Sequence, residues 1–200
     1  MRQRGVTLIE VVVVVTIIGL LLLAGMPSVS EFLRNQRVRT AAEAIQSGLQ
    51  QARTEAVRRN TSVGFWLVSL SDPNSMDNSC ALSSGSSSWV VSINSPAGKC
   101  AASASTTIDP MLVASRAAGD SGSAITVVAT QSDGATAANS VTFNGFGQVN
   151  GAAAISRIKI TTATSPTSNR QLRVDVSSGG QVRMCDLGVT DTTDPRYCTP

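Results

Sequence analysis

Hydrophobic and polar positions along the chain fall into three regions with different spacing. Residues 6–26 form an almost continuous apolar run that contains one charge, Glu10. As an α-helix with a rise of about 1.5 Å per residue, this run would be about 30 Å long, which matches the hydrocarbon thickness of a bilayer. The pattern predicts one membrane-spanning helix, and Arg2 and Arg4 before it predict a cytoplasmic N-terminus.

The second region, residues 27–59, has apolar residues at every third or fourth position, which is typical of an amphipathic helix with one face packed on a sheet. The apolar positions are Phe32, Leu33, Ala41, Ala42, Ile45, Leu49, Ala52 and Ala56. The other faces are expected to carry Arg34, Arg37, Arg39, Arg53, Arg58 and Arg59. Glutamates are interleaved with these arginines, so a solvated face is favoured over a surface for DNA or anionic lipid. Pro27 lacks a backbone N–H and permits a kink or local melting where this region begins.

The third region, residues 60–200, has short runs rich in β-branched and aromatic residues, separated by Ser, Gly, Asn, Asp and Pro. Several runs alternate between apolar and polar positions, which indicates antiparallel sheets with one solvated face. The predicted strands are residues 63–68, 89–93, 124–129, 141–143, 157–161, 172–176 and 181–185. A helix followed by strands predicts an α+β fold rather than an α/β fold.

Composition argues against catalysis. The 200 residues suit one domain with a real core, and they include no His. His is the commonest general base and the commonest neutral metal ligand, so we expect neither an enzyme nor a metal site, and no cofactor or small-molecule substrate. The formal net charge of +3 includes two arginines at the extreme N-terminus, so gross charge does not argue for nucleic acid.

The four cysteines are Cys80, Cys100, Cys185 and Cys198, without a C-x-x-C pair. Two disulfides are the natural interpretation, and they require an oxidising compartment, consistent with export. Four cysteines allow three pairings. Pairing Cys80 with Cys100 and Cys185 with Cys198 is preferred because each bond closes a short loop, but the sequence leaves the other pairings open.

The apolar run could also belong to a cleaved secretory signal or to a plain membrane anchor. A secretory signal normally has a shorter apolar core and a small-x-small cleavage site, for which residues 28–30 are a loose match. Neither interpretation explains Glu10, because insertion scales put a carboxylate near the membrane centre at roughly 2.5–3.5 kcal/mol. Glu10 is therefore a candidate functional residue.

The N-terminal sequence R-x-R-G-V-T-L-I-E, followed by the apolar run, resembles the class III leader shared by type IV pilins and type II secretion pseudopilins. The resemblance implies a pilin fold, with a leader at residues 1–5 that prepilin peptidase removes after Gly5. It also implies methylation of the new N-terminus, Val6, where the family usually has Phe. Glu10 would pair with the N-terminal amine of a neighbouring subunit, and Pro27 would be the family's helix-distorting proline. The chain would be stored in the inner membrane as a single-pass protein with a periplasmic head.

Within residues 60–200, three features resemble the GspH/FimT branch of the pilin superfamily: Trp66, the block V-T-F-N-G-F-G-Q-V and the terminal L-R-V-D-V-S-S-G-G-Q-V-R-M-C. The tail between Cys185 and Cys198 is most similar to the disulfide-closed tail of FimU-like minor pilins. This resemblance implies a minor pilin that primes pilus assembly within a tip complex of minor and major pilins. Such a complex supports twitching, adhesion and DNA uptake.

Two alternatives stay open. A FimT-like competence pilin would bind DNA through a Gly-Arg-x-Arg motif, of which residues 180–183 keep one arginine, Arg183. Arg170, Arg173 and Arg196 could rebuild a basic patch, although isolated surface arginines are at least as good an explanation. A type II secretion minor pseudopilin H would share the N-terminal region, but the C-terminal disulfide loop favours the pilus.

Overall fold

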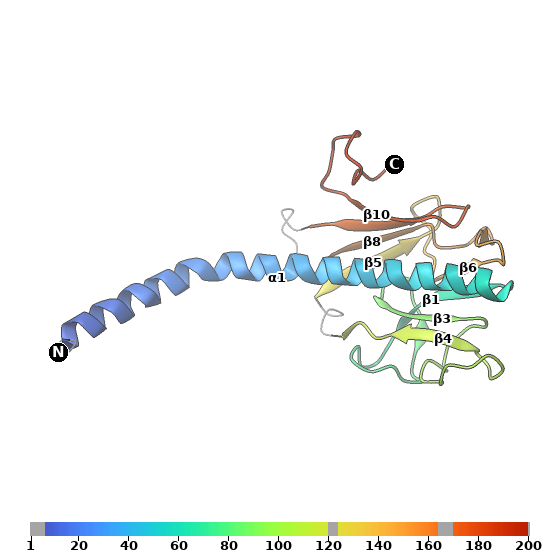
Figure 1. Cartoon of the computed structure of the whole chain (residues 1–200), viewed down its shortest axis with the longest axis horizontal. Coiled ribbons are helices and arrows are strands. Elements are labelled where there is room, and N and C mark those ends of the chain that lie inside the picture. The colour runs from blue at the N-terminus through green and yellow to red at the C-terminus, as the bar shows by residue number, and fades with distance from the viewer. Residues whose placement is uncertain (1–6, 120–123, 164–169, 200) are drawn as a thin grey trace, which may run out of the picture.

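A computed structural model describes residues 7–119, 124–163 and 170–199, without the side chains of residues 22–29. One long helix, α1 (Leu8–Arg59), projects from a β-rich head, as Figure 1 shows. The head follows the helix in sequence, so the fold is the predicted α+β pilin fold, a long N-terminal helix packed on antiparallel sheets. The proposed processing residues Gly5 and Val6 lie outside the described residues.

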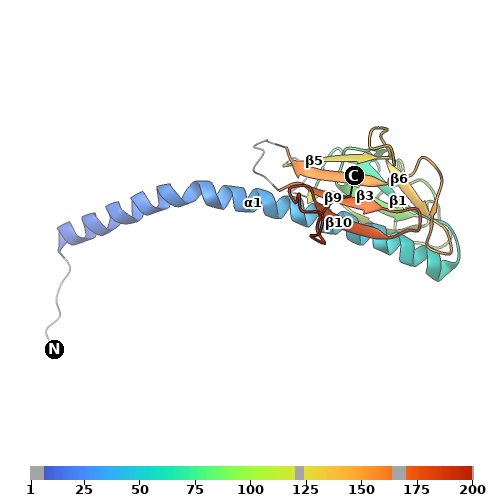
Figure 2. The same cartoon turned by 90° about the horizontal axis from the view of Figure 1, so that it is seen from above.

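Helix α1 has a defined start and end. Thr7 is the N-cap, and its hydroxyl accepts a hydrogen bond from the backbone N–H of Glu10 at 3.4 Å. Asn60 ends the helix in the left-handed region, with φ of 49°. The backbone is helical through position 27, and the helix curves gently rather than melting there (Figures 1 and 2). The loss of one backbone N–H at a proline is compatible with such a bend.

Only the C-terminal part of α1 packs on the head. Its buried face consists mainly of small and β-branched side chains: Val38, Ala41, Ala42, Ala44, Ile45, Leu49, Ala52 and Ala56. Phe32 and Leu33 were expected on this face, but 61% and 51% of their surfaces are exposed, so that expectation was wrong. The spacing of apolar residues shows which face of a helix can be buried, but not how far along the helix the sheet extends.

The head contains two antiparallel sheets. The first has the order β4-β3-β1-β6-β7, with β2 also paired to β1. Its strands are β1 (Val63–Ser69), β2 (Ala81–Leu82), β3 (Ser88–Ser92), β4 (Leu112–Arg116), β6 (Ser140–Phe143) and β7 (Val149–Asn150). The second has the order β10-β9-β8-β5. Its strands are β5 (Ile125–Thr130), β8 (Arg157–Thr162), β9 (Leu172–Val176) and β10 (Val182–Asp186).

Helix α1 lies across both sheets. It contacts β1, β3 and β6 of the first sheet and β8, β9 and β10 of the second. In Figure 1, β1, β3 and β4 of the first sheet lie below the helix, and β8 and β10 of the second lie above it. One core therefore joins the helix to both sheets, and it includes Ile45 and Leu49 of the helix, Phe65 and Phe143 of the first sheet and Ile158 of the second.

The predicted strands are all present, with ends that differ by single residues. The prediction missed β2, β4 and β7. Strands β2 and β7 have two residues each, too few for an alternating pattern to be visible. Strand β4, with the sequence L-V-A-S-R, carries one buried residue and no alternation.

Both disulfides join cysteines that are near in sequence. Cys80 is bonded to Cys100, and Cys185 to Cys198, with S–S distances of 2.03 Å. These are the short-range pairings that loop length favoured. The first bond lies in a second, smaller core with Val68, Val90 and Leu112, and the second attaches the C-terminal tail to β10.

Candidate functional site

The projecting part of α1 has an apolar surface. Its exposed large side chains are Leu8, Ile9, Val11 to Val15, Ile17, Ile18, Leu20 and Leu21, with exposed fractions from 48% to 83%. Glu10 stands among them as the single charge between Thr7 and Leu21. Among the residues that the structure describes, no helix is both long enough and apolar enough to cross a membrane. The predicted span 6–26 also includes Val6 and side chains beyond Leu21, which are not described, so it stays a prediction.

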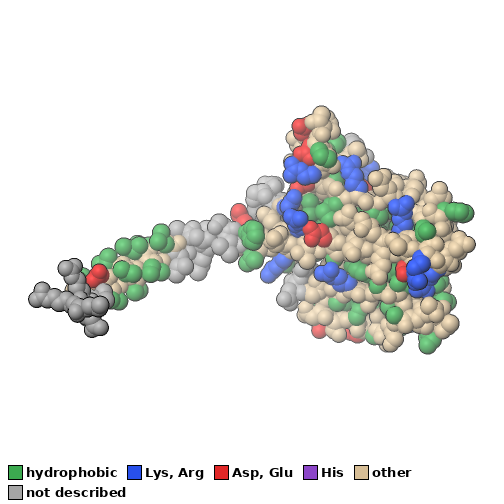
Figure 3. Space-filling model, viewed as in Figure 1, with side chains coloured by type: hydrophobic (Ala, Val, Ile, Leu, Met, Phe, Trp, Pro, Cys, Tyr) green, Lys and Arg blue, Asp and Glu red, His purple; other side chains and the backbone are tan. Residues whose placement is uncertain are grey.

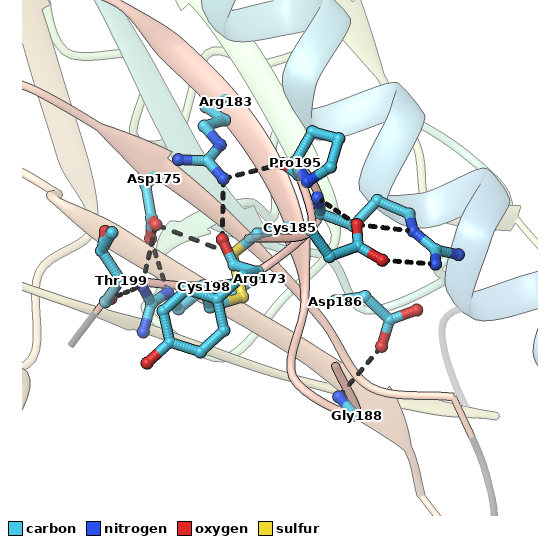
Figure 4. Close-up of a disulfide and its surroundings, with 12 residues drawn as sticks. Arg173, Asp175, Arg183, Cys185, Asp186, Gly188, Pro195, Cys198 and Thr199 are labelled. Carbon is cyan, nitrogen blue, oxygen red and sulfur yellow. Dashed lines mark hydrogen bonds and ion pairs between the residues drawn. A yellow bond between two sulfur atoms is a disulfide. The ribbon is translucent and has the colours of Figure 1, made fainter. Parts of the chain in front are cut away.

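The C-terminal tail, residues 187–199, folds back along the outer edge of β10 (Figure 4). The backbone N–H of Asp186 donates to the carbonyl of Arg196 at 2.8 Å, and Asp186 forms a parallel bridge with Tyr197. Arg183 donates from Nη2 to the carbonyls of Pro195 and Tyr197 at 2.8 and 2.7 Å. Arg183, the remaining arginine of the candidate DNA motif, therefore holds the tail in place.

The other three candidate DNA-binding arginines are paired with carboxylates. Arg173 makes two hydrogen bonds to Asp175, at 2.7 and 2.9 Å, and also donates to the carbonyl of Thr199. Arg170 pairs with Asp186 at 3.2 Å.

Arg196 makes two hydrogen bonds to Asp194, at 3.1 and 2.7 Å. The side chain of Arg196, followed by its backbone N–H, lowers the pKa of Asp194 to about 2. The same contact raises the pKa of Arg196. At neutral pH the two residues form an ion pair with no net charge.

The four arginines therefore lie near one another without forming a purely basic patch. Figure 3 shows Arg and Lys side chains with Asp and Glu side chains between them where the head meets the helix. A phosphate would have to compete with the carboxylates already paired there, and net neutralisation of phosphates is what drives non-specific binding to nucleic acid. The structure brings the predicted residues together, but with the charge of three of them already balanced.

A pocket of about 190 Å³ lies between α1 and the β9–β10 hairpin. It is lined by Arg39, Glu43, Arg170, Leu172, Met184, Cys185, Asp186 and Arg196. Leu172 and Cys185 are buried and Met184 is half-buried, so its floor is apolar. Arg39 and Glu43 pair with each other at 2.7 Å on its rim. Sequence reasoning missed this pocket because it joins helix and strand residues that are far apart in the chain.

The turn between β6 and β7 presents Phe146 to solvent, with 84% of its surface exposed. The Asn144 side-chain oxygen accepts hydrogen bonds from the backbone N–H groups of Phe146 and Gln148, each at 3.0 Å. Gly147, with φ of 75°, closes the turn and its carbonyl accepts from Arg53 Nε at 3.1 Å. Arg53 is exposed, as expected for a solvated helix face, and it also reaches the head because the turn ends beside the last turns of α1.

Metal binding has no visible basis in the described parts of the chain. Across residues 7–119, 124–163 and 170–199, no three His, Cys, Asp or Glu side chains are grouped so that they could hold a metal ion.

Residues 41–180 match the family described as Type II transport protein GspH. The chain belongs to this GspH family. Residues 1–26 match the prokaryotic N-terminal methylation motif, which contains the proposed leader and Glu10. The chain is thus a type IV minor pilin or pseudopilin, a membrane-anchored structural subunit that is processed by prepilin peptidase and assembles with other pilins.

Among curated proteins, no match to the chain was found. Among solved structures, the chain is similar to two crystal forms of the type IV minor pilin FimU of Pseudomonas aeruginosa. The first is 14% identical with a TM-score of 0.46, and the alignment covers 76% of this chain and 91% of FimU. The second is 15% identical with a TM-score of 0.43, covering 73% and 90%.

Proposed function

We propose that this GspH-family subunit is a minor pilin that helps to prime type IV pilus assembly within a complex at the pilus tip. Before assembly it is stored in the inner membrane as a single-pass protein with a periplasmic head. Prepilin peptidase cuts between Gly5 and Val6. Its partners are other minor pilins and the major pilin, and through the pilus it supports twitching motility, adhesion and DNA uptake.

The exposed apolar surface of α1 carries this proposal. From Leu8 to Leu21 the large side chains have no partner within the described residues, and about half or more of each is exposed. Such a surface is stable only in lipid or against other helices. Lipid would cover it during storage, and the helices of neighbouring subunits would cover it in the filament.

Glu10 limits the ways in which neighbouring α1 helices can pack on this surface. A carboxylate is unfavourable in an apolar core unless it is paired, and the amine of the processed Val6 on a neighbouring subunit would pair with it. The Thr7 hydroxyl accepts from the backbone N–H of Glu10, so this cap does not occupy the carboxylate. We therefore propose that Glu10 aligns the α1 helices of neighbouring subunits, which we call stems.

Surface piliation in a deletion strain tests the proposal. Deletion should abolish pili or reduce them sharply, and the full chain should restore them. The Glu10→Ala chain should fail to restore them, whereas Thr16→Ala, a change at another polar position of the stem, should succeed. Normal piliation in the deletion strain would contradict the proposal.

A second candidate is a minor pseudopilin of type II secretion, which the description of the matched family favours. It would use the same stem in a different apparatus. Deletion would then block the release of secreted proteins and leave surface pili unchanged, so the same strain, assayed for both, separates the two candidates.

A further inference from the structure

We propose that Phe32, Leu33, Arg34 and Arg37, where α1 leaves the head, bind the headgroup layer of an anionic phospholipid membrane while the subunit is stored. We call these residues the collar. The inference rests on the proposed storage in the inner membrane. It adds a preference for anionic lipid, which an apolar helix alone does not have.

The apolar half of the collar is exposed although it lies directly before the head (Figure 1). Phe32 and Leu33 are 61% and 51% exposed, and the first buried side chain described in α1 is Val38. Phe32 follows the end of the predicted membrane span, residues 6–26, by six residues, a rise of about 9 Å. The headgroup layer is roughly 5–8 Å thick on each side of a bilayer. Helical side chains lean toward the N-terminus, here toward the membrane, so Phe32 and Leu33 continue the apolar surface of the span into this layer.

The basic half of the collar carries charges that the protein does not balance. Arg37 is exposed and makes no hydrogen bond or ion pair within the described residues. Arg34 donates from Nη2 to the Ser30 hydroxyl at 3.3 Å, but its buried Nε has no acceptor there. Glu31 is the only acidic residue between positions 28 and 38, so the two arginines outnumber it. An anion from outside the protein is therefore the partner that the collar lacks.

Further along α1 the arginines are bonded to the protein itself. These residues are Arg39, Arg53, Arg58 and Arg59, which bond to Glu43, to the Gly147 carbonyl and, for the last two, to Glu55. The interleaved glutamates thus neutralise the helix beyond the collar. The unbalanced charges lie at the end of the head nearest the membrane.

Arg34 and Arg37 are close enough to the membrane to meet lipid phosphates. Their Cα atoms lie about 12 and 17 Å beyond the end of the predicted span. Long arginine side chains reach toward the helix N-terminus, and a tilt of about 20° brings them closer still. A guanidinium binds phosphate with two parallel hydrogen bonds. Near an anionic surface each arginine changes the affinity about fivefold.

The lipids retained by the full chain test the inference. The chain is placed in nanodiscs that contain phosphatidylglycerol and phosphatidylcholine in equal amounts, and the lipids that stay bound are identified by native mass spectrometry. We expect the anionic phosphatidylglycerol to be enriched. Arg34→Gln and Arg37→Gln should each lower this enrichment about fivefold, whereas Glu31→Gln should raise it. Arg58→Gln, an exposed arginine at the far end of α1, is the matched control and should change nothing.

A fluorescent probe tests the position of the apolar half. Dansylalanine in place of Phe32 should be quenched by lipids with spin-labelled headgroups. Dansylalanine in place of Phe146, which is 84% exposed beside the last turns of α1, should not be quenched.

Equal retention of the two lipids, an enrichment that Arg34→Gln and Arg37→Gln leave unchanged, or equal quenching at positions 32 and 146 would overturn the inference. Because the chain would still enter the nanodisc, these results would leave the proposed function intact. A chain that does not enter the nanodisc at all would contradict storage in the membrane, and the inference with it.

Discussion

Arg53 and Gly147 are 94 positions apart in sequence, and a hydrogen bond of 3.1 Å joins Arg53 Nε to the Gly147 carbonyl oxygen. The same carbonyl lies against Gly180 in the β9–β10 turn, where a Cβ on Gly180 would overlap it. The helix, the β6–β7 turn and the β9–β10 turn therefore meet at one point. This junction connects the stem to both sheets at the end of the head that carries Phe146.

Gly180→Ala should destabilise the head strongly. Gly180 has φ of 78°, which is strained for alanine, and the added methyl would also collide with Gly147. We expect a loss of about 3 kcal/mol in the free energy of unfolding. Gly98→Ala is the matched control, because Gly98 has φ of 72° but open space around it, so only the backbone strain of about 1 kcal/mol applies. Urea unfolding of the chain in detergent, followed by tryptophan fluorescence, measures both. Equal losses in the two variants would contradict the steric argument.

Gly48→Ala tests the close approach of α1 to the first sheet. A Cβ at Gly48 would lie 2.8 Å from the Phe65 ring and 2.9 Å from the Trp89 ring, and both rings are buried. Alanine favours the helix by about 1 kcal/mol over glycine, but the displacement of two packed rings should outweigh this gain. We expect a net loss of about 1–2 kcal/mol in the same unfolding experiment.

Gly19→Ala is the control for helix propensity. Gly19 lies in the projecting part of α1, and a Cβ added there would meet no other group within 4 Å. The change should leave the unfolding midpoint of the head unchanged. A Gly48→Ala chain that is as stable as the natural one, or more stable, would show that the rings can move aside.

The stem and the sheets could be predicted from the sequence because their signals are periodic. Ala41, Ile45, Leu49 and Ala52 recur at helical spacing, and β8 and β9 alternate buried and less buried residues. Each signal lies within one element, so no knowledge of the tertiary arrangement is needed. The limits of the packed face at Phe32 and Leu33 depend instead on where the head begins along α1.

The candidate site was predictable only in part. The tail and the four candidate arginines could be identified from their positions in the sequence. Their pairing could not, because Arg170 with Asp186 and Arg183 with Pro195 depend on the register of β9 with β10 and on the path of the tail. The pocket also needs α1 to lie beside β10, a contact between residues more than a hundred positions apart.

The Asp194–Arg196 pair predicts a specific titration. Arg196 lowers the pKa of Asp194 from 3.8 to about 2, so the pair favours the folded state above pH 3.8 and this contribution is lost as the pH falls through about 2. Arg196→Ala should raise the pKa of Asp194 towards 3.8. Arg183→Ala, which removes a contact to the tail but none to Asp194, should leave it low. Carboxyl chemical shifts of Asp194 measured against pH report the value. A pKa near 3.8 in the natural chain would show that the tail holds a different conformation in solution.

Binding to DNA should be weak even at low salt. Arg170, Arg173 and Arg196 each have a carboxylate partner, so few counterions would be released on contact with phosphates. We expect no gel shift of duplex DNA by the full chain in detergent at about 50 mM salt. Asp194→Asn, which frees the charge of Arg196, should give the first detectable gel shift if the tail can reach DNA. Glu43→Gln is a control that frees the charge of Arg39 instead.

A shift with the natural chain that weakens steeply with salt and disappears in Arg183→Ala would contradict this prediction. It would also show that Arg183 can leave the tail carbonyls to bind phosphate, which would restore the DNA-binding alternative for this head.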